Sequence, residues 1–152
     1  MPGRRKSRQR ALQILFLWDL RKLSVDEAID TFYKSLYSAE SEEETGEDSD
    51  REGNRETFVV TLVKGTAANA ESLDRIIAER AENWRLERMP YVDRNILRMA
   101  IYEMKNEGTA AAIVIDEALE LARRYSEEEA IPFLNGVLDS VRKVILPEAA
   151  RK

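Results

Sequence analysis

Five basic side chains lie within the first ten residues, and no acidic side chain accompanies them. They are Arg4, Arg5, Lys6, Arg8 and Arg10, and they give this segment a net charge of +5. Five positive charges this close together repel one another in a helix unless a polyanion neutralises them. Positions 4, 5 and 8 fall along one side of a helix end, where guanidinium groups can bind phosphates through paired N–H donors. The spacing therefore indicates a phosphate-binding helix start.

The side chains most used in catalysis are missing from the rest of the chain. There is no cysteine and no histidine, which excludes thiolate nucleophiles, Ser-His-Asp triads, disulfides and the usual zinc sites. The six glycines are scattered, so no glycine-rich phosphate loop is predicted. Carboxylate pairs such as Asp116/Glu117 and Asp93/Glu103 are far more often solvated or ion-paired than catalytic. We therefore expect no enzyme, no metal and no cofactor.

The net charge of −5 conceals two opposed segments. Residues 39–54 contain eight acidic side chains against Arg51, a net charge of −7 that leaves +2 for the remainder. This segment has almost no apolar side chains and two glycines, so we expect a disordered acidic loop there. Two interpretations stay open: a solvated loop with no task, or an electrostatic decoy that competes with RNA for the basic residues.

The length of 152 residues predicts one compact domain over 1–152, large enough to fold without disulfides. Its longest apolar runs are too short to cross a bilayer, and no signal-peptide cleavage pattern follows the first of them. We expect a cytoplasmic protein without a membrane segment.

Apolar residues recur at spacings of three and four, and no segment alternates at spacing two, so the predicted fold class is all-α. Ser24 and Glu27 form a capping box at the start of the second helix. The sixth helix is apolar on so many sides that we expect it to be the central, most buried one. The aromatic residues Phe16, Trp18 and Trp84 are interpreted as core. About seven helices are expected, beginning near Arg5, Ser24, Phe58, Leu73, Pro90, Ala110 and Pro132.

The start of the last helix depends on a conflict between two signals. Ser126 and Glu129 spell a second capping box, but Pro132 would then lie inside the helix at a cost of about 3 kcal/mol. We therefore expect a short turn over 126–130 and a helix that begins at Pro132. That start places Phe133 in the first turn, beside a positive helix end.

The fifth helix carries Arg94 and Arg98 one turn apart, with Asp93 nearby. Charges at this spacing form either a surface salt-bridge lattice or a polar face for a partner. The sequence leaves both interpretations open.

Four segments carry a combination of motifs. They read RRKSRQRALQILFLWD, NWRLERMPYVDRNILRMAIYEM, VIDEALELARRYS and FLNGVLDSV. Together they resemble the NusB family of bacterial transcription antitermination factors. The resemblance spans the chain from Arg4 to Ile145, and four motifs in the same order are specific where any single one would not be.

The resemblance implies an all-helical fold of two small packed bundles with no catalytic activity. It also implies binding to boxA RNA of ribosomal RNA leader transcripts, together with NusE, a small-subunit ribosomal protein. The resulting complex would join RNA polymerase and resist premature termination. Carried over by position, the RNA-binding residues are Arg4, Arg5, Lys6, Arg8, Glu129 and Phe133, and the NusE-facing residues are Glu87 and Asp93.

Two departures from the family pattern bear on RNA binding. Pro132 stands where the family often has a basic residue, which removes a charge and a backbone donor beside Phe133. The acidic segment 39–54 is also unusually long. An exposed Phe133 could stack on an unpaired base, whereas the strong amphipathic pattern of its helix equally favours a core position.

Three rivals to the RNA-binding interpretation follow from the sequence. Ribosomal RNA cytosine methyltransferases share the domain, but their chemistry needs a cysteine and a cofactor domain that this chain lacks. A helical protein-protein adaptor would use the face from Asp93 to Glu103 without needing the arginines. A homodimer would hide the RNA surface.

Overall fold

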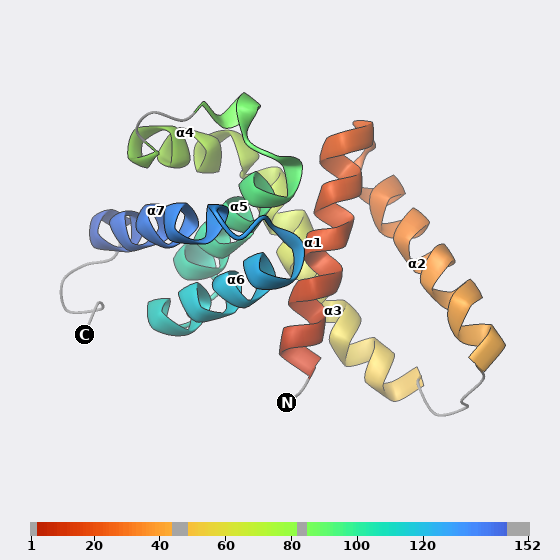
Figure 1. The fold of residues 1–152 in the computed structure, drawn as a ribbon. Helices are drawn as coiled ribbons and strands as arrows, with labels where there is room; N and C mark the ends of the chain where they lie inside the picture. The colour runs from red at the N-terminus through yellow and green to blue at the C-terminus, as the bar shows by residue number, and fades with distance from the viewer. Residues whose placement is uncertain (1–2, 44–48, 82–84, 146–152) are drawn as a thin grey trace. The chain divides into compact units, whose positions relative to one another are not determined.

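The computed structural model describes the backbone of residues 3–43, 49–81 and 85–145, with side-chain surroundings throughout except at 39–43 and 49–56. Seven α-helices and one short 3-10 helix, η1, form within the described residues (Figure 1), so the all-α prediction is confirmed. In chain order they are α1 (Gly3–Arg21), α2 (Val25–Glu43), α3 (Ser49–Ala68), α4 (Ala70–Arg80), η1 (Leu86–Arg88), α5 (Tyr91–Asn106), α6 (Ala111–Tyr125) and α7 (Ala130–Ile145).

The chain divides into two compact units, residues 1–67 and residues 68–152. Each unit is a single continuous stretch of chain, which agrees with the two small bundles that the family resemblance implies. The first unit contains α1, α2 and nearly all of α3, and the second contains the remaining helices.

In the first unit, α1 and α2 form a helical hairpin whose turn is encoded locally (Figure 1). Lys22 has a φ of 58°, a left-handed conformation that ends α1 and reverses the chain. The predicted capping box then opens α2: Glu27 N–H donates to Ser24 Oγ and Ser24 N–H donates to Glu27 Oε1, each at 3.1 Å. The buried apolar residues of the unit are Ala11, Leu12, Ile14, Leu15, Ala28, Tyr33, Phe58, Val59, Leu62 and Val63.

The core prediction for the large aromatic residues was partly wrong. Phe16 and Trp18 are half-buried and do not belong to the buried core of the first unit. Trp84 lies outside the described residues.

Helical backbone extends into both ends of the acidic segment 39–54. α2 continues to Glu43 and α3 begins at Ser49, so the stretch between these helices is shorter than the loop expected from composition. Residues 44–48 lie outside the described residues, and their disorder stays a prediction. Glu has a high helix propensity, which explains how an acidic segment can continue a helix.

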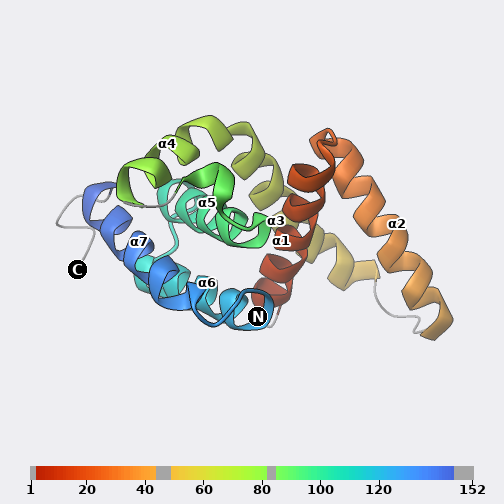
Figure 2. The same ribbon diagram turned by 45° about the horizontal axis from the view of Figure 1, so that its top comes forward.

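In the second unit, α5 is the central helix. Figure 2 shows it surrounded by α4, α6 and α7, and it packs against all three. Eleven of its 16 residues are buried. The prediction that α6 is the most buried helix was wrong, because its buried residues form one stripe and Ile113 is 53% exposed. The central position of α5 was not evident from the sequence, because several of its buried side chains are polar. These are Asp93, Asn95, Arg98 and Glu103.

Helix α7 begins at Ala130, two residues earlier than predicted. Pro132 is then the third residue of the helix, where the missing N–H would have had no intrahelical partner. The carbonyl with which its ring would clash, four residues earlier, belongs to Glu128, which precedes the helix. The expected turn is present, closed by a hydrogen bond from Ala130 N–H to Glu127 O at 3.0 Å.

Candidate functional site

The five basic residues of the α1 start separate into two groups. Arg4, Arg5 and Lys6 are exposed, whereas Arg8 is only 7% exposed and Arg10 only 5%. The first turn of α1 holds no acidic residue. Cations at a helix N-terminus oppose the helix dipole, so the arrangement costs stability that a bound anion would restore. Three side chains, rather than five, are therefore exposed at this helix end.

Phe58 of α3 organises the arginines at this helix start. The guanidinium carbon of Arg4 lies 3.8 Å from the centroid of the Phe58 ring, and that of Arg8 lies 5.6 Å from it. Both distances are within the range of a cation–π interaction. Phe58 is itself only 8% exposed. The sequence showed Phe58 only as one apolar residue of a helical stripe, and no spacing rule linked it to arginines 50 and 54 positions away.

The predicted partner-binding residues differ in accessibility. Glu87 is exposed within η1. Asp93 lies in the first turn of α5, is 6% exposed, and accepts a hydrogen bond from Ser126 Oγ at 2.6 Å. Ser126 is the C-cap residue that follows α6, so this bond joins the start of α5 to the end of α6. Asp93 therefore has a structural contact in addition to any contact it makes with a partner.

Glu129 and Phe133 lie where the turn after α6 enters α7. Glu129 is exposed and directly precedes the first residue of the helix, while Phe133 is half-buried in its first turn. Phe133 is therefore neither a core residue nor a fully exposed one, and base stacking on its ring stays a prediction. These two residues belong to the second unit, whereas Arg4, Arg5, Lys6 and Arg8 belong to the first.

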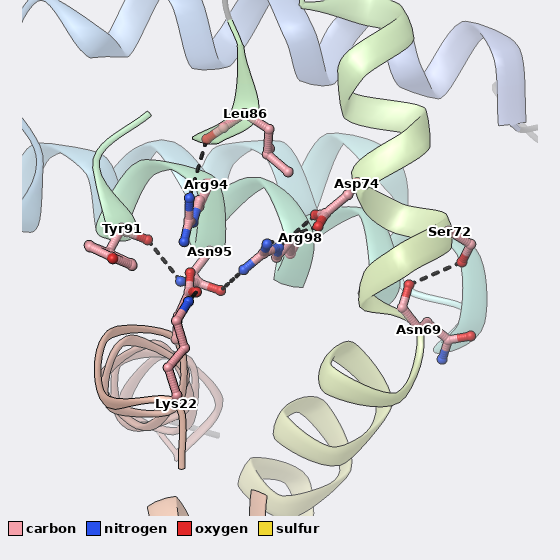
Figure 3. Close-up of polar contacts among 10 residues, drawn as sticks. Lys22, Asn69, Ser72, Asp74, Leu86, Tyr91, Arg94, Asn95 and Arg98 are labelled. Atoms are coloured by element: carbon pink, nitrogen blue, oxygen red, sulfur yellow. Dashed lines mark hydrogen bonds and ion pairs between the residues drawn. The ribbon is translucent and has the colours of Figure 1, made fainter. Parts of the chain in front are cut away.

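Arg98 forms a buried polar network in the second unit (Figure 3). Its Nε and Nη2 donate to the two carboxylate oxygens of Asp74 at 2.7 and 2.9 Å, and its Nη1 donates to Asn95 Oδ1 at 3.1 Å. Asn95 in turn donates from Nδ2 to the backbone oxygen of Tyr91 at 2.8 Å. Arg98 is only 6% exposed. It therefore forms part of neither a surface salt-bridge lattice nor an exposed face for a partner, the two interpretations that the sequence left open.

Arg94 lies one turn before Arg98 on the same helix. Its guanidinium carbon is 4.5 Å from the Tyr91 ring centroid, and its Nη1 donates to Leu86 O at 3.3 Å. Figure 3 shows this bond reaching from α5 to η1. Arg94 thereby anchors the short helix that presents Glu87.

One titratable group in the second unit has a displaced pKa. Burial raises the pKa of Tyr102 above its usual value of 10.0, and the hydrogen bond from its hydroxyl to Glu107 Oε2, at 3.0 Å, acts in the same direction. The described residues contain no group of three or more acidic side chains placed to hold a metal ion. None of the described helices is long and apolar enough to cross a membrane.

These features define an all-helical protein of two compact units that exposes a basic helix start. The model of the NusB family matches residues 5–143. The transcription antitermination protein NusB of Solibacter usitatus is 53% identical over 143 residues, which cover 94% of this chain and 90% of the relative. The chain therefore belongs to the NusB family.

Solved structures of the family have the same fold. A structure of T. maritima NusB superimposes with a TM-score of 0.80 at 28% identity, over 97% of this chain and 95% of that one. A structure of the antitermination factors NusB and NusE in complex with double-stranded RNA gives a TM-score of 0.73 at 26% identity, over 94% of this chain and 98% of that one.

Proposed function

We propose that this chain is a transcription antitermination factor that binds boxA RNA of ribosomal RNA leader transcripts together with NusE. The observation that carries the proposal is the exposed cluster of Arg4, Arg5 and Lys6 at the start of α1, in a chain of the NusB family. The structural relative solved with NusE and double-stranded RNA supports both partners. The assembled complex joins RNA polymerase in the cytoplasm.

The RNA-binding surface of this proposal has two chemically distinct parts. Arg4, Arg5 and Lys6 contact backbone phosphates through charge-assisted hydrogen bonds. At the other part, the half-buried ring of Phe133 stacks on an unpaired base, and the exposed carboxylate of Glu129 accepts hydrogen bonds from base amino groups. Stacking needs an unpaired base, so the proposal favours single-stranded over double-stranded RNA.

The NusE-facing surface is placed at η1 and the start of α5. Glu87 supplies an exposed carboxylate for a basic ribosomal protein, and Arg94 holds η1 in place from α5. Asp93, bonded to Ser126, fixes the adjoining helix start and contributes little free surface of its own. This assignment makes Glu87 the more important of the two carboxylates for affinity.

The protein acts without catalysing a reaction. Without cysteine and histidine, catalysis would fall to carboxylates, lysine, tyrosine or hydroxyl groups. Two of the buried groups of these kinds, Asp93 and Tyr102, have hydrogen-bond partners that belong to the fold.

The test is an RNA titration at several salt concentrations, with and without NusE, using a boxA oligonucleotide in single-stranded and duplex form. Three exposed basic side chains on single-stranded RNA predict a logarithmic salt slope of about −2. Tighter binding with NusE and a preference for the single strand are expected. Absence of binding in every arm would overturn the RNA function.

A protein-protein adaptor that never contacts RNA is the alternative function. It predicts that NusE binds while the oligonucleotide does not. Gel filtration of the protein alone, with NusE, and with NusE plus the oligonucleotide separates these outcomes, and the first run also detects a homodimer.

The acidic segment 39–54 has a testable role as a decoy. If it competes with RNA for the basic helix start, deleting residues 40–52 should raise RNA affinity, most strongly at low salt. A variant with the same length in which the acidic residues become Gln or Asn is the matched control, because it removes charge without shortening the chain. Unchanged affinity in both variants leaves the segment as a solvated connection.

A further inference from the structure

We propose that Phe58 is a positioning residue of the RNA site: its ring holds the Arg4 guanidinium over α3 and so orients its N–H donors for RNA phosphate. This inference rests on the proposed function and goes beyond it, because Phe58 itself touches no RNA. Its basis is the contact of 3.8 Å between the guanidinium carbon and the ring centroid.

A planar guanidinium has two chemically different surfaces. Its flat faces are weakly hydrated and bind aromatic rings, whereas its five N–H donors lie around the edge. The contact with Phe58 occupies one face of Arg4, and the side chain remains exposed. The edge donors are therefore left for phosphate oxygens, and holding the group does not consume them.

The ring also lowers the electrostatic cost of crowding positive charges. Arg4 and Arg8 are one helical turn apart, and like charges at that spacing repel. The negative face of the Phe58 ring lies near both, at 3.8 and 5.6 Å. One aromatic side chain from α3 thus steadies two cations of α1.

Fixing an arginine before RNA arrives reduces the entropy lost on binding. A long side chain normally loses rotamer freedom when it engages a ligand. Because Phe58 is 8% exposed and anchored in the core of the first unit, it is a fixed support. Arg4 should consequently bind phosphate more tightly than an arginine with an unrestricted side chain.

The experiment replaces Phe58 by phenylalanines carrying one, two or three fluorine atoms, which withdraw the ring's negative charge while nearly preserving its shape. RNA affinity is measured with NusE and a boxA oligonucleotide. The expected result is a stepwise loss that reaches roughly three- to tenfold with three fluorines. Trifluorination of Phe32 is the matched control, because that ring packs edge-on against Tyr33 at 5.2 Å in the same unit. It should leave RNA affinity unchanged.

A second series separates positioning from general packing. In an Arg4→Ala background, fluorination of Phe58 should have less than half of its effect on RNA affinity. An undiminished effect would show that Phe58 acts through the core, which overturns the inference. Equal affinity across the fluorinated series, with normal binding by the unmodified protein, also overturns it while the proposed function stands. Absence of RNA binding by the unmodified protein refutes both.

Discussion

Two arginines, one in each unit, show two uses of the same side chain. Arg98 is buried, and Asp74 and Asn95 together accept hydrogen bonds from three of its nitrogens. Arg4 is exposed and rests one face against Phe58. A carboxylate engages the guanidinium edge, whereas a ring engages its face. The nature of the contact therefore separates an arginine committed to the fold from one that keeps donors for a ligand.

The largest expected effect comes from removing the committed arginine. Arg98→Ala leaves the partly buried Asp74 carboxylate without its partner and should lower the free energy of unfolding by about 3 kcal/mol. Urea denaturation measures the loss. Arg4→Ala is the comparison variant and should cost less than about 1 kcal/mol. Equal losses in the two variants would remove the distinction between the arginines.

Removing the exposed arginines should weaken RNA binding and leave the free energy of unfolding nearly unchanged. Arg4→Ala combined with Arg5→Ala should weaken RNA binding roughly tenfold or more at low salt and reduce the magnitude of the salt slope by about 1.4. Thermal stability and NusE binding should change little. Fluorescence anisotropy across a salt series measures the RNA effect. Parallel loss of NusE affinity would mean that the helix start supports the fold.

Ser126→Ala tests the commitment of Asp93 to the fold. Losing the 2.6 Å hydrogen bond to this carboxylate should destabilise the protein by about 1 kcal/mol. Ser72→Ala is a matched serine control, because its hydroxyl bonds only an exposed backbone oxygen, that of Asn69, at 3.0 Å. Denaturation of both variants, followed by NusE titration, distinguishes a structural carboxylate from a binding one. A fall in NusE affinity without a fall in stability would place Asp93 at the interface.

The smallest expected effect appears only at alkaline pH. The raised pKa of Tyr102 means that the unfolded chain loses this proton first as pH increases. Its contribution to stability is therefore fully present below pH 10 and declines as pH rises through the higher folded-state pKa. Tyr102→Phe should lack this part of the decline. Identical alkaline unfolding profiles of the two proteins would contradict the assignment.

Local signals in the sequence predicted the local structure well. The capping box of Ser24 and Glu27 forms as expected, because both of its partners lie within one helical turn. The predicted start of α7 was two residues too late. Proline destabilises the interior of a helix but not its first turn, so Pro132 is compatible with a helix that begins at Ala130. The central helix was misidentified because Arg98 and Glu103 are buried despite their charge. The bonds from Arg98 to Asp74 are tertiary contacts that periodicity cannot reveal.

The candidate site was predictable only in its charged part. The cluster of basic residues was evident from composition, but its division into exposed and buried members was not. Phe58 lies on another helix, and Asp74 is 24 residues from Arg98, so neither contact has a signature at short spacing. Long-range contacts of this kind depend on how helices pack, which a single sequence does not encode in any local pattern.

The two compact units are consecutive in the chain, and this order has a consequence in time. The contacts that define the first unit are all made between residues 1–67, and the second unit consists of the remaining 85 residues. At translation rates of about 5 to 20 residues per second, the first unit precedes the last residue of the second by about 4 to 17 seconds. Helical hairpins form far faster than this. During synthesis, the basic helix start is thus assembled against α3 while the helices around α5 are still being made.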